Sequence, residues 1–173
     1  HCCTSPCLFR TVSCFGGADG EAVLGVSSGV APFNFNWSPG SLTGNSVTGL
    51  SAGTYTVTVT DNASCIGIID VIINEPGELT LSPAGVIAAT CGLSDGTVGV
   101  GVVGGTGPFT YLWSPFGGTN QTEPNLSSGL YSVTVEDDNG CITTLQIGVP
   151  DATGPTVTLV STSQPSCFGV NDG

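Results

Sequence analysis

The chain has 173 residues, of which 27 are glycine and eight are cysteine, and it carries 13 acidic residues against a single basic one, Arg10. The net charge of −12 argues against nucleic acids and anionic membranes as partners, because the chain offers no cationic surface to displace counterions from phosphates. No apolar run approaches the roughly 18 residues of a membrane-spanning helix. Eight cysteines without a single methionine or lysine indicate a chain that works outside the reducing cytosol.

The first seven residues form a cysteine-rich segment that is predicted to be a cap or a junction. It holds Cys2, Cys3 and Cys7 beside the only histidine, His1. A zinc site is one interpretation, but the other five cysteines are widely spaced and form no Cys-x-x-Cys pair, so disulfides are favoured. The three cysteines are expected to lock the segment internally or to link it to another subunit.

Landmark residues then recur along the chain with an offset of 76 or 77 positions. The pairs that are 76 positions apart are Trp37 and Trp113, Tyr55 and Tyr131, and Cys65 and Cys141. A further series has three members, Cys14, Cys91 and Cys167, and each of these cysteines precedes an Asp-Gly pair. The repeat predicts a first domain at residues 8–75, a second at 76–152 and, at 153–173, the first strand of a third that is truncated or donated to a neighbour.

Within each unit, apolar residues alternate with polar ones, which is the pattern of a β-strand with one buried face. The pattern covers residues 22–26, 33–37, 55–59 and 69–73, and again 98–102, 109–113, 131–135 and 145–149. No stretch shows the 3.6-residue period of an amphipathic helix, and turn-forming residues interrupt the pattern about every ten residues. The sequence therefore predicts an all-β fold of tandem immunoglobulin-like antiparallel β-sandwiches, each of about 76 residues.

A Leu-x-x-Gly-x-Tyr motif precedes one strand of each unit and predicts a tyrosine corner, in which the phenol binds nearby backbone at a crossing between the sheets. The residues concerned are Leu50, Gly53 and Tyr55, and Leu126, Gly129 and Tyr131. Trp37 and Trp113 lie on alternating aromatic strands, so they are expected in the core. The alternative for both tryptophans is a platform on which a sugar stacks.

We predict one disulfide inside each unit, Cys14 with Cys65 and Cys91 with Cys141, from the first strand of the unit to the start of its last. Closing a loop of about 50 residues would stabilise such a small domain by about 4 kcal/mol in the chain-entropy model. Cys167 has no predicted mate within the sequence, so the natural chain is expected to continue.

Three motifs in a fixed order resemble the SprB repeat of large gliding and surface adhesins of Bacteroidetes-type bacteria. They are Cys-x-x-x-x-Asp-Gly, Pro-Phe-x-Phe/Tyr-x-Trp-Ser-Pro and Leu-Ser-x-Gly-x-Tyr-x-Val-Thr-Val-x-Asp-x-x-x-Cys. They lie at residues 14–20, 32–39 and 50–65, and again at 91–96, where the first motif is one residue shorter, 108–115 and 126–141. The last motif also looks like the polycystic-kidney-disease-type sandwich. The resemblance implies a very long, secreted, cell-surface protein of tandem repeats, exported by the type IX system and displayed as a filament.

The sequence offers little for catalysis, because its only histidine is terminal and it has no lysine, so the chain is not expected to be an enzyme. Paired carboxylates for glycoside hydrolysis are also disfavoured, since only Asp61 and Asp137 correspond between the units. No cofactor is expected apart from calcium, for which Asp95, Asp137 and Asp138 are weak candidate ligands. The alternative is that these Asp-Gly and Asp-Asn-Gly stretches simply form turns.

These observations predict a structural repeat region of an extracellular adhesin or filament, in which each unit adds length to a stalk. The expected partners are further copies of the repeat and an external surface or polysaccharide. Exposed strand edges offer a route to lateral self-assembly. Two alternatives stay open: a carbohydrate- or surface-binding module, which would expose aromatic side chains in a groove, and a spacer in a secreted enzyme.

Overall fold

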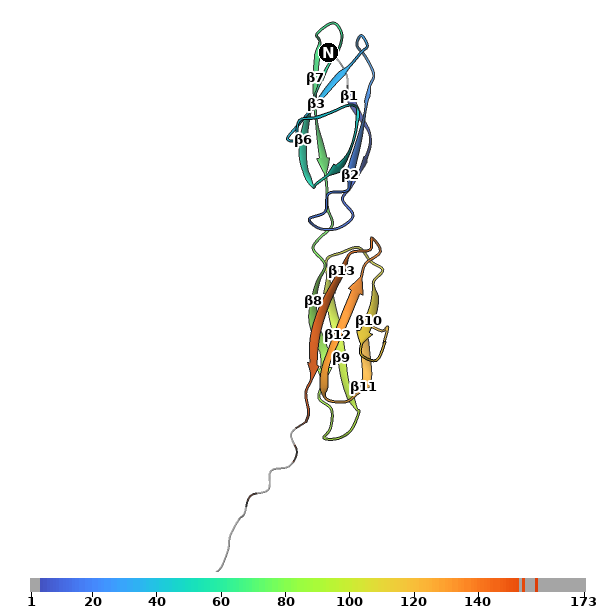
Figure 1. The fold of residues 1–173 in the computed structure, drawn as a ribbon, viewed down its shortest axis with the longest axis vertical. Coiled ribbons are helices and arrows are strands. Elements are labelled where there is room, and N and C mark those ends of the chain that lie inside the picture. Colours follow the sequence, from blue (N-terminus) through green and yellow to red (C-terminus); the bar gives the residue numbers. More distant parts are fainter. Residues whose placement is uncertain (1–3, 153, 155–157, 159–173) are drawn as a thin grey trace, which may run out of the picture.

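The computed structural model describes residues 4–152, 154 and 158, with the backbone alone for residues 4–7. These residues form thirteen β-strands and no helix, arranged as two sandwiches that lie end to end (Figure 1). The prediction of an all-β fold built from tandem sandwiches is confirmed. Within the described ranges there is thus no helix of the length and apolar character needed to cross a membrane.

The first sandwich packs a three-stranded sheet against a four-stranded one, and all neighbouring strands are antiparallel. The smaller sheet has the order β1 (Thr4–Arg10), β2 (Gly20–Val26) and β5 (Ser46–Leu50). The larger sheet has the order β4 (Leu42–Thr43), β3 (Asn34–Ser38), β6 (Gly53–Thr60) and β7 (Ile66–Ile73).

The second sandwich repeats this arrangement without a counterpart of the two-residue β4. One sheet has the order β8 (Thr80–Ile87), β9 (Gly96–Val103) and β11 (Thr122–Leu126). The other has the order β10 (Thr110–Ser114), β12 (Gly129–Glu136) and β13 (Ile142–Val149). The two units therefore share one topology, as their common sequence landmarks indicate.

The alternation pattern does not locate the edge strands β1, β5, β8 and β11. All four flank a central strand, β2 or β9, and their pairing with it is interrupted by register shifts. Such shifts break the two-residue period on which the prediction relies. Strand β1 also starts at Thr4, so the sheet of the first sandwich extends into the segment 1–7, which the sequence predicts to be a separate cap or junction.

Each sandwich encloses its own hydrophobic core. Trp37 and Trp113 occupy the same position in β3 and β10 and are 0% and 1% exposed. Their indole N–H groups donate to the carbonyl oxygens of Gly44 (2.9 Å) and Asn120 (2.8 Å). Both tryptophans are therefore core residues, and neither indole presents a face on which a sugar could stack.

The equivalent phenols of the two units, Tyr55 and Tyr131, lie where the chain crosses from one sheet to the other. The Tyr131 hydroxyl donates to the carbonyl oxygen of Ser127 at 2.9 Å, and the Tyr55 hydroxyl to that of Ser51 at 3.1 Å. These are the bonds that a tyrosine corner predicts. The other residues of the motif are the buried Leu50 and Leu126, and Gly53 and Gly129, which begin β6 and β12.

The glycines of the first two Asp-Gly pairs, Gly20 and Gly96, begin β2 and β9, where there is no room for a side chain. A Cβ atom on Gly96 would lie 2.7 Å from the Val149 Cγ1 and 2.8 Å from the Leu126 carbonyl oxygen. A Cβ atom on Gly20 would meet the corresponding Ile73 at 2.7 Å. Close packing of the two sheets at this end thus accounts for the repetition of glycine.

Candidate functional site at the junction between the sandwiches

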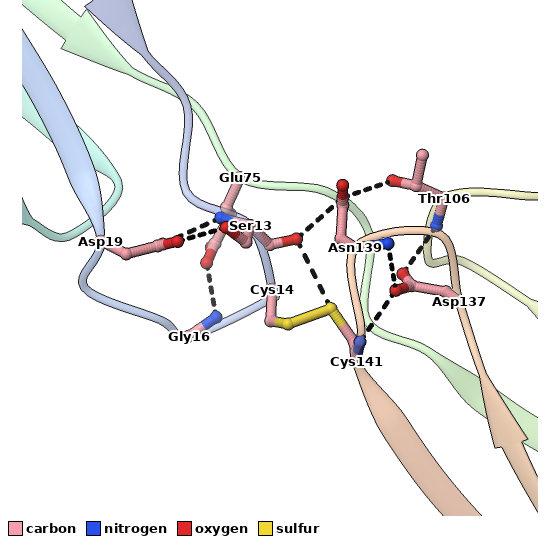
Figure 2. Close-up of a disulfide and its surroundings, with 9 residues drawn as sticks. All are labelled: Ser13, Cys14, Gly16, Asp19, Glu75, Thr106, Asp137, Asn139 and Cys141. Atoms are coloured by element: carbon pink, nitrogen blue, oxygen red, sulfur yellow. Dashed lines mark hydrogen bonds between the residues drawn. A yellow bond between two sulfur atoms is a disulfide. The ribbon is translucent and has the colours of Figure 1, made fainter.

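A disulfide joins the two sandwiches (Figure 2). Cys14, in the loop between β1 and β2, is bonded to Cys141, in the turn between β12 and β13, with a Cα–Cα distance of 5.7 Å. Both predicted intradomain pairs, Cys14 with Cys65 and Cys91 with Cys141, are therefore wrong. Cys65 and Cys91 are exposed free thiols.

The predicted pairs fail because each would have to bridge the length of a sandwich. Ile73, the last residue of β7, packs against Gly20, which follows the Cys14 loop, whereas Cys65 precedes the first residue of β7. Eight residues of extended strand span about 26 Å. A disulfide requires Cα atoms within about 7 Å. Cys14 therefore faces the second sandwich, while Cys65 lies at the far end of the first.

A hydrogen bond and a sulfur–oxygen contact accompany the disulfide across the junction (Figure 2). The Asn139 side-chain amide donates to the carbonyl oxygen of Ser13 at 3.0 Å, and the Cys141 Sγ lies 3.5 Å from the same oxygen. Asn139 belongs to the second sandwich and Ser13 to the first. The contact thus fixes the Cys141 turn against the Cys14 loop.

The linker between β7 and β8 is held by both sandwiches. The Glu75 carboxylate accepts a hydrogen bond from the backbone N–H of Gly16 at 2.6 Å. Two residues later, the carbonyl oxygen of Gly77 accepts from the N–H of Gly105, in the second sandwich, at 2.8 Å. The linker is therefore tied at two points besides the disulfide, which restrains the angle between the units.

Asp137 builds the turn that presents Cys141. Its side chain is 5% exposed, and its carboxylate accepts backbone hydrogen bonds from Thr106, Asn139 and Cys141, each at 2.9 Å. Burial opposes ionisation of this carboxyl, but the bonds from Cys141, Thr106 and Asn139 outweigh it and lower the pKa of Asp137. The ionised carboxylate thus holds the turn in the shape that the disulfide uses.

Asp19 organises the loop on the other side of the disulfide. Its carboxylate accepts hydrogen bonds from the hydroxyl and from the backbone N–H of Ser13, the latter at 2.9 Å. These two bonds, the hydroxyl bond first, lower the pKa of Asp19. The aspartate of the Asp-Gly pair therefore closes the Cys14 loop, while the glycine permits close packing behind it.

The predicted calcium ligands are not brought together. Asp95 lies in the loop before β9 and Asp137 in the turn after β12, at opposite ends of the second sandwich, and Asp138 is next to Asp137. In the part of the chain that the structure describes, no group of three or more His, Cys, Asp or Glu side chains could hold a metal ion. The carboxylates of Asp95 and Asp137 instead bind backbone groups of their own loops.

Several predicted cysteines lie outside the described residues. These are Cys2 and Cys3 of the N-terminal segment and Cys167 of the predicted third unit, and only the backbone of Cys7 is described, within β1. The predicted strand within 153–173 also falls outside, apart from residues 154 and 158.

Comparison with known families finds one family model that is similar to part of each unit. The model of the SprB repeat matches the chain twice, at residues 11–42 and at residues 89–118. Each match covers part of one sandwich, so both units contain a segment that is similar to the SprB repeat. Each SprB match starts in the loop that carries Cys14 or Cys91 and runs beyond the buried Trp37 or Trp113. The loop on one side of the junction is thus part of the SprB pattern.

Solved structures that are similar to this chain match it at low sequence identity. The C-terminal 282-residue fragment of intimin, in complex with the intimin-binding domain of its translocated receptor, is 16% identical over 84% of this chain, with a TM-score of 0.45. The chain spans 64% of the length of that fragment. DIP-gamma IG1+IG2 is 9% identical over 87% of this chain and 98% of its own, with a TM-score of 0.41. The BSP domain of a biofilm-associated protein is 15% identical over 87% of this chain and 30% of its own, with a TM-score of 0.28. No curated protein matches the sequence.

Proposed function

We propose that the chain is a load-bearing stretch of the stalk of an extracellular, cell-surface adhesin or filament. The SprB matches and the tandem sandwiches support the broader class, a surface adhesin-type repeat region without a catalytic role. Mechanical reach, display as a filament, a part in gliding or adhesion and export by the type IX system are the finer parts of the proposal. Further copies of the repeat and an external surface or polysaccharide are the proposed partners.

The disulfide between the sandwiches is the observation that carries this proposal. The described chain enters the first sandwich through β1, at whose far end Cys14 lies, and leaves the second through β13, which follows Cys141 (Figure 1). Tension applied to the two ends would therefore pass through β1, the disulfide and β13. The residues between Cys14 and Cys141 lie inside a closed loop, so the pull would not extend them. Such a loop keeps most residues of both cores from being extended, although Val12 of the first core and Ile147 and Val149 of the second lie on the load path.

Stretching single molecules of the chain by its two ends tests the proposal. The two cysteines are 127 positions apart, so the chain between them is about 420–460 Å long when fully extended. We expect the oxidised chain to keep this length hidden, and the same chain in a reducing agent to release it in unfolding steps. The variant Cys141→Ser should behave like the reduced chain without any reductant.

The matched control is Cys65→Ser, which removes an exposed thiol with no disulfide partner in the structure. The force–extension traces of this variant should equal those of the unchanged chain, both with and without the reducing agent. If the oxidised and reduced chains released the same length, the disulfide would bear no load and the mechanical proposal would fail. A carbohydrate-binding module gains no support, because both tryptophans are buried. A spacer in a secreted enzyme gains none either, because the SprB matches point to a structural repeat.

A further inference from the structure

Among the described residues, two exposed thiols, Cys65 and Cys91, occupy the two outer ends of the pair of sandwiches. Cys65 lies in the turn between β6 and β7, at the end of the first sandwich that is remote from the junction. Cys91 lies in the loop between β8 and β9, at the end of the second sandwich that is remote from the junction. Each thiol occupies in its own unit the position that a bonded cysteine occupies in the other unit: Cys65 corresponds to Cys141, and Cys91 corresponds to Cys14.

The Cys91 loop repeats the structure of the Cys14 loop. The Asp95 carboxylate accepts from the N–H and hydroxyl of Thr90 at 2.7 Å and 2.6 Å, as Asp19 does from Ser13. The bond from the Thr90 hydroxyl is also the main cause of the lowered pKa of Asp95. The N–H of Ala89 donates to the carbonyl oxygen of Pro150 at 2.9 Å, and Val12 donates to Asn74 at the same distance. The loop that binds a partner at one junction is thus built again at the outer end of the second sandwich.

The Cys65 turn repeats the structure of the Cys141 turn. The Asp61 carboxylate accepts from the backbone N–H groups of Val30 (3.0 Å), Ala63 (2.9 Å) and Cys65 (2.8 Å). The bond from Val30 is the first cause of the lowered pKa of Asp61. The N–H of Asp61 donates to the Cys65 carbonyl oxygen at 3.0 Å, the distance found for Asp137 and Cys141. The turn therefore holds its cysteine in the arrangement that forms the observed disulfide.

The chain that leaves the second sandwich passes directly beside Cys91. The Cys91 thiol donates a hydrogen bond to the carbonyl oxygen of Ala152 at 2.9 Å, and its Sγ is 3.8 Å from the position of a Cβ atom on Gly154. The linker passes the Cys14 loop in the same way, through the bond between Glu75 and Gly16. A repeat that followed would therefore begin within reach of Cys91.

We propose that Cys65 and Cys91 form disulfides to neighbouring repeats. Cys91 pairs with a cysteine at the Cys141 position of the repeat on its side, and Cys65 pairs with a cysteine at the Cys14 position of the repeat on the other side. The inference rests on the proposed function as a tandem stalk and names the partner at each end, another SprB-type unit. Cys91 lies between Cys14 and Cys141 in the sequence, so the loop closed by each disulfide would overlap the loop closed by the next one along the array.

The bond forms by thiol–disulfide exchange with a disulfide oxidant such as oxidised glutathione. The thiolate of one cysteine attacks glutathione disulfide, forms a mixed disulfide and releases one glutathione thiolate. The thiolate of the second cysteine then attacks the protein sulfur of the mixed disulfide and releases the second glutathione. The two cysteines lose two protons and two electrons, and the glutathione disulfide takes up both to become two thiols.

Two complementary variants of the full chain test the pairing. Both carry Ser at the four cysteines at positions 2, 3, 7 and 167, and both keep Cys14 and Cys141. The first also carries Cys65→Ser, so that its outer thiol is Cys91, and the second carries Cys91→Ser, so that its outer thiol is Cys65. They are incubated singly and as an equal mixture with oxidised and reduced glutathione. Mass spectrometry of unreduced digests identifies the linked peptides.

The mixture should yield a dimer of twice the chain mass, linked by Cys91 of one copy and Cys65 of the other. The amount of this dimer should exceed the amount of dimer formed in either separate sample. As a control, a third chain lacks both outer thiols and carries Leu112→Cys, a position 58% exposed in the middle of β10. It should not cross-link to Cys91 above the level of the separate samples. Absence of the mixed dimer, or a majority of Cys91–Cys91 or Cys65–Cys65 links, would overturn the inference. Since all the variants keep Cys14 and Cys141, such a failure would leave the test of the stalk itself unaffected.

Discussion

Cys14 and Cys141 are 127 positions apart in the sequence, and their Cα atoms lie 5.7 Å apart across the junction between two sandwiches. The bond couples two units whose hydrophobic cores share no residue. When one unit unfolds, the disulfide therefore still holds it to the other unit. The predictions below separate the contribution of this bond from the interactions inside each unit.

Loss of the junction disulfide should destabilise the pair of units as a whole. In the chain-entropy model, a loop of this length contributes about 5 kcal/mol to the free energy of unfolding both units. The variant Cys14→Ser should lose much of this amount, as measured by urea denaturation under oxidising conditions. Cys65→Ser should change it by less than about 0.5 kcal/mol, because that thiol is exposed and unpaired in the structure. Equal stabilities for the two variants would contradict the assignment of the bond.

Asp137→Asn should destabilise the second sandwich and slow formation of the junction disulfide. The asparagine oxygen can accept two of the three backbone bonds, but its amide group would face the N–H of Thr106, which needs an acceptor. Leaving that donor unpaired should cost about 1–3 kcal/mol. The unfolding midpoint of the second unit and the rate of disulfide formation during refolding both report the change. Asp138→Asn, an exposed neighbour, should leave both unchanged.

Acid should destabilise both sandwiches. The pKa values of Asp61 and Asp137 are lower in the folded chain than in the unfolded one, so the unfolded state binds protons more readily. Unfolded aspartate titrates near pH 3.9, so the stabilisation is complete above about pH 4 and is lost as the pH falls toward the folded-state pKa values. Urea midpoints measured from about pH 7 down to about pH 2 should show this decline. The double variant Asp61→Asn, Asp137→Asn should show a flatter decline, and stability that rose on acidification would refute the account.

Gly96→Ala should cost the second unit about 1–3 kcal/mol, because the added methyl group would overlap Val149 and the Leu126 carbonyl oxygen. Gly148→Ala is the matched control, since a Cβ atom there has no neighbour within 4 Å. Thermal unfolding of the two variants should therefore differ, with Gly96→Ala melting at the lower temperature. Similar melting temperatures would mean that the two sheets can separate at this end without cost.

Tyr131→Phe should remove the bond from the phenol to the Ser127 carbonyl oxygen, together with its longer contact of 3.4 Å with the Ser127 hydroxyl, and lower the stability of the second unit by about 1 kcal/mol. Tyr111→Phe provides the comparison, because no hydrogen bond of the Tyr111 hydroxyl is present among the described residues. Urea denaturation should rank the two variants in this order. The reverse order would show that the corner bond does not stabilise the crossing between the sheets.

Much of the fold was predictable because it follows from side-chain alternation and internal repetition. Strands such as β6 and β12 bury every second residue, so their period is visible in the sequence. The edge strands were harder to locate, since register shifts such as that between Pro124 and Leu126 interrupt their period. The repetition of Trp37 at Trp113 predicted two equivalent cores, because each indole fills the centre of its own unit.

The junction was not predictable from cysteine spacing. Spacing shows that Cys14 and Cys91 are equivalent, but it does not show at which end of a sandwich either one lies. The positions of Cys65 and Cys141 could have been predicted from the tyrosine-corner motif. Each of these cysteines follows a long strand that starts near the corner, so each lies a full strand length from it. Only the strand order of the sheets shows that the Cys14 loop is at the corner end.

The separation of Cys14 from Cys65 also sets the order of events when the protein matures. Cys65 is much closer to Cys14 along the sequence than Cys141 is. In a nascent, unfolded polypeptide, an oxidant would therefore join Cys14 to Cys65 more readily than to Cys141. A bond formed at that moment would tie together two points that the finished sandwich must hold about one strand length apart, and would block it. Unless thiol–disulfide exchange undoes such a bond, the first unit must fold before Cys14 and Cys65 are oxidised, and once it has folded the two cysteines are too far apart to pair.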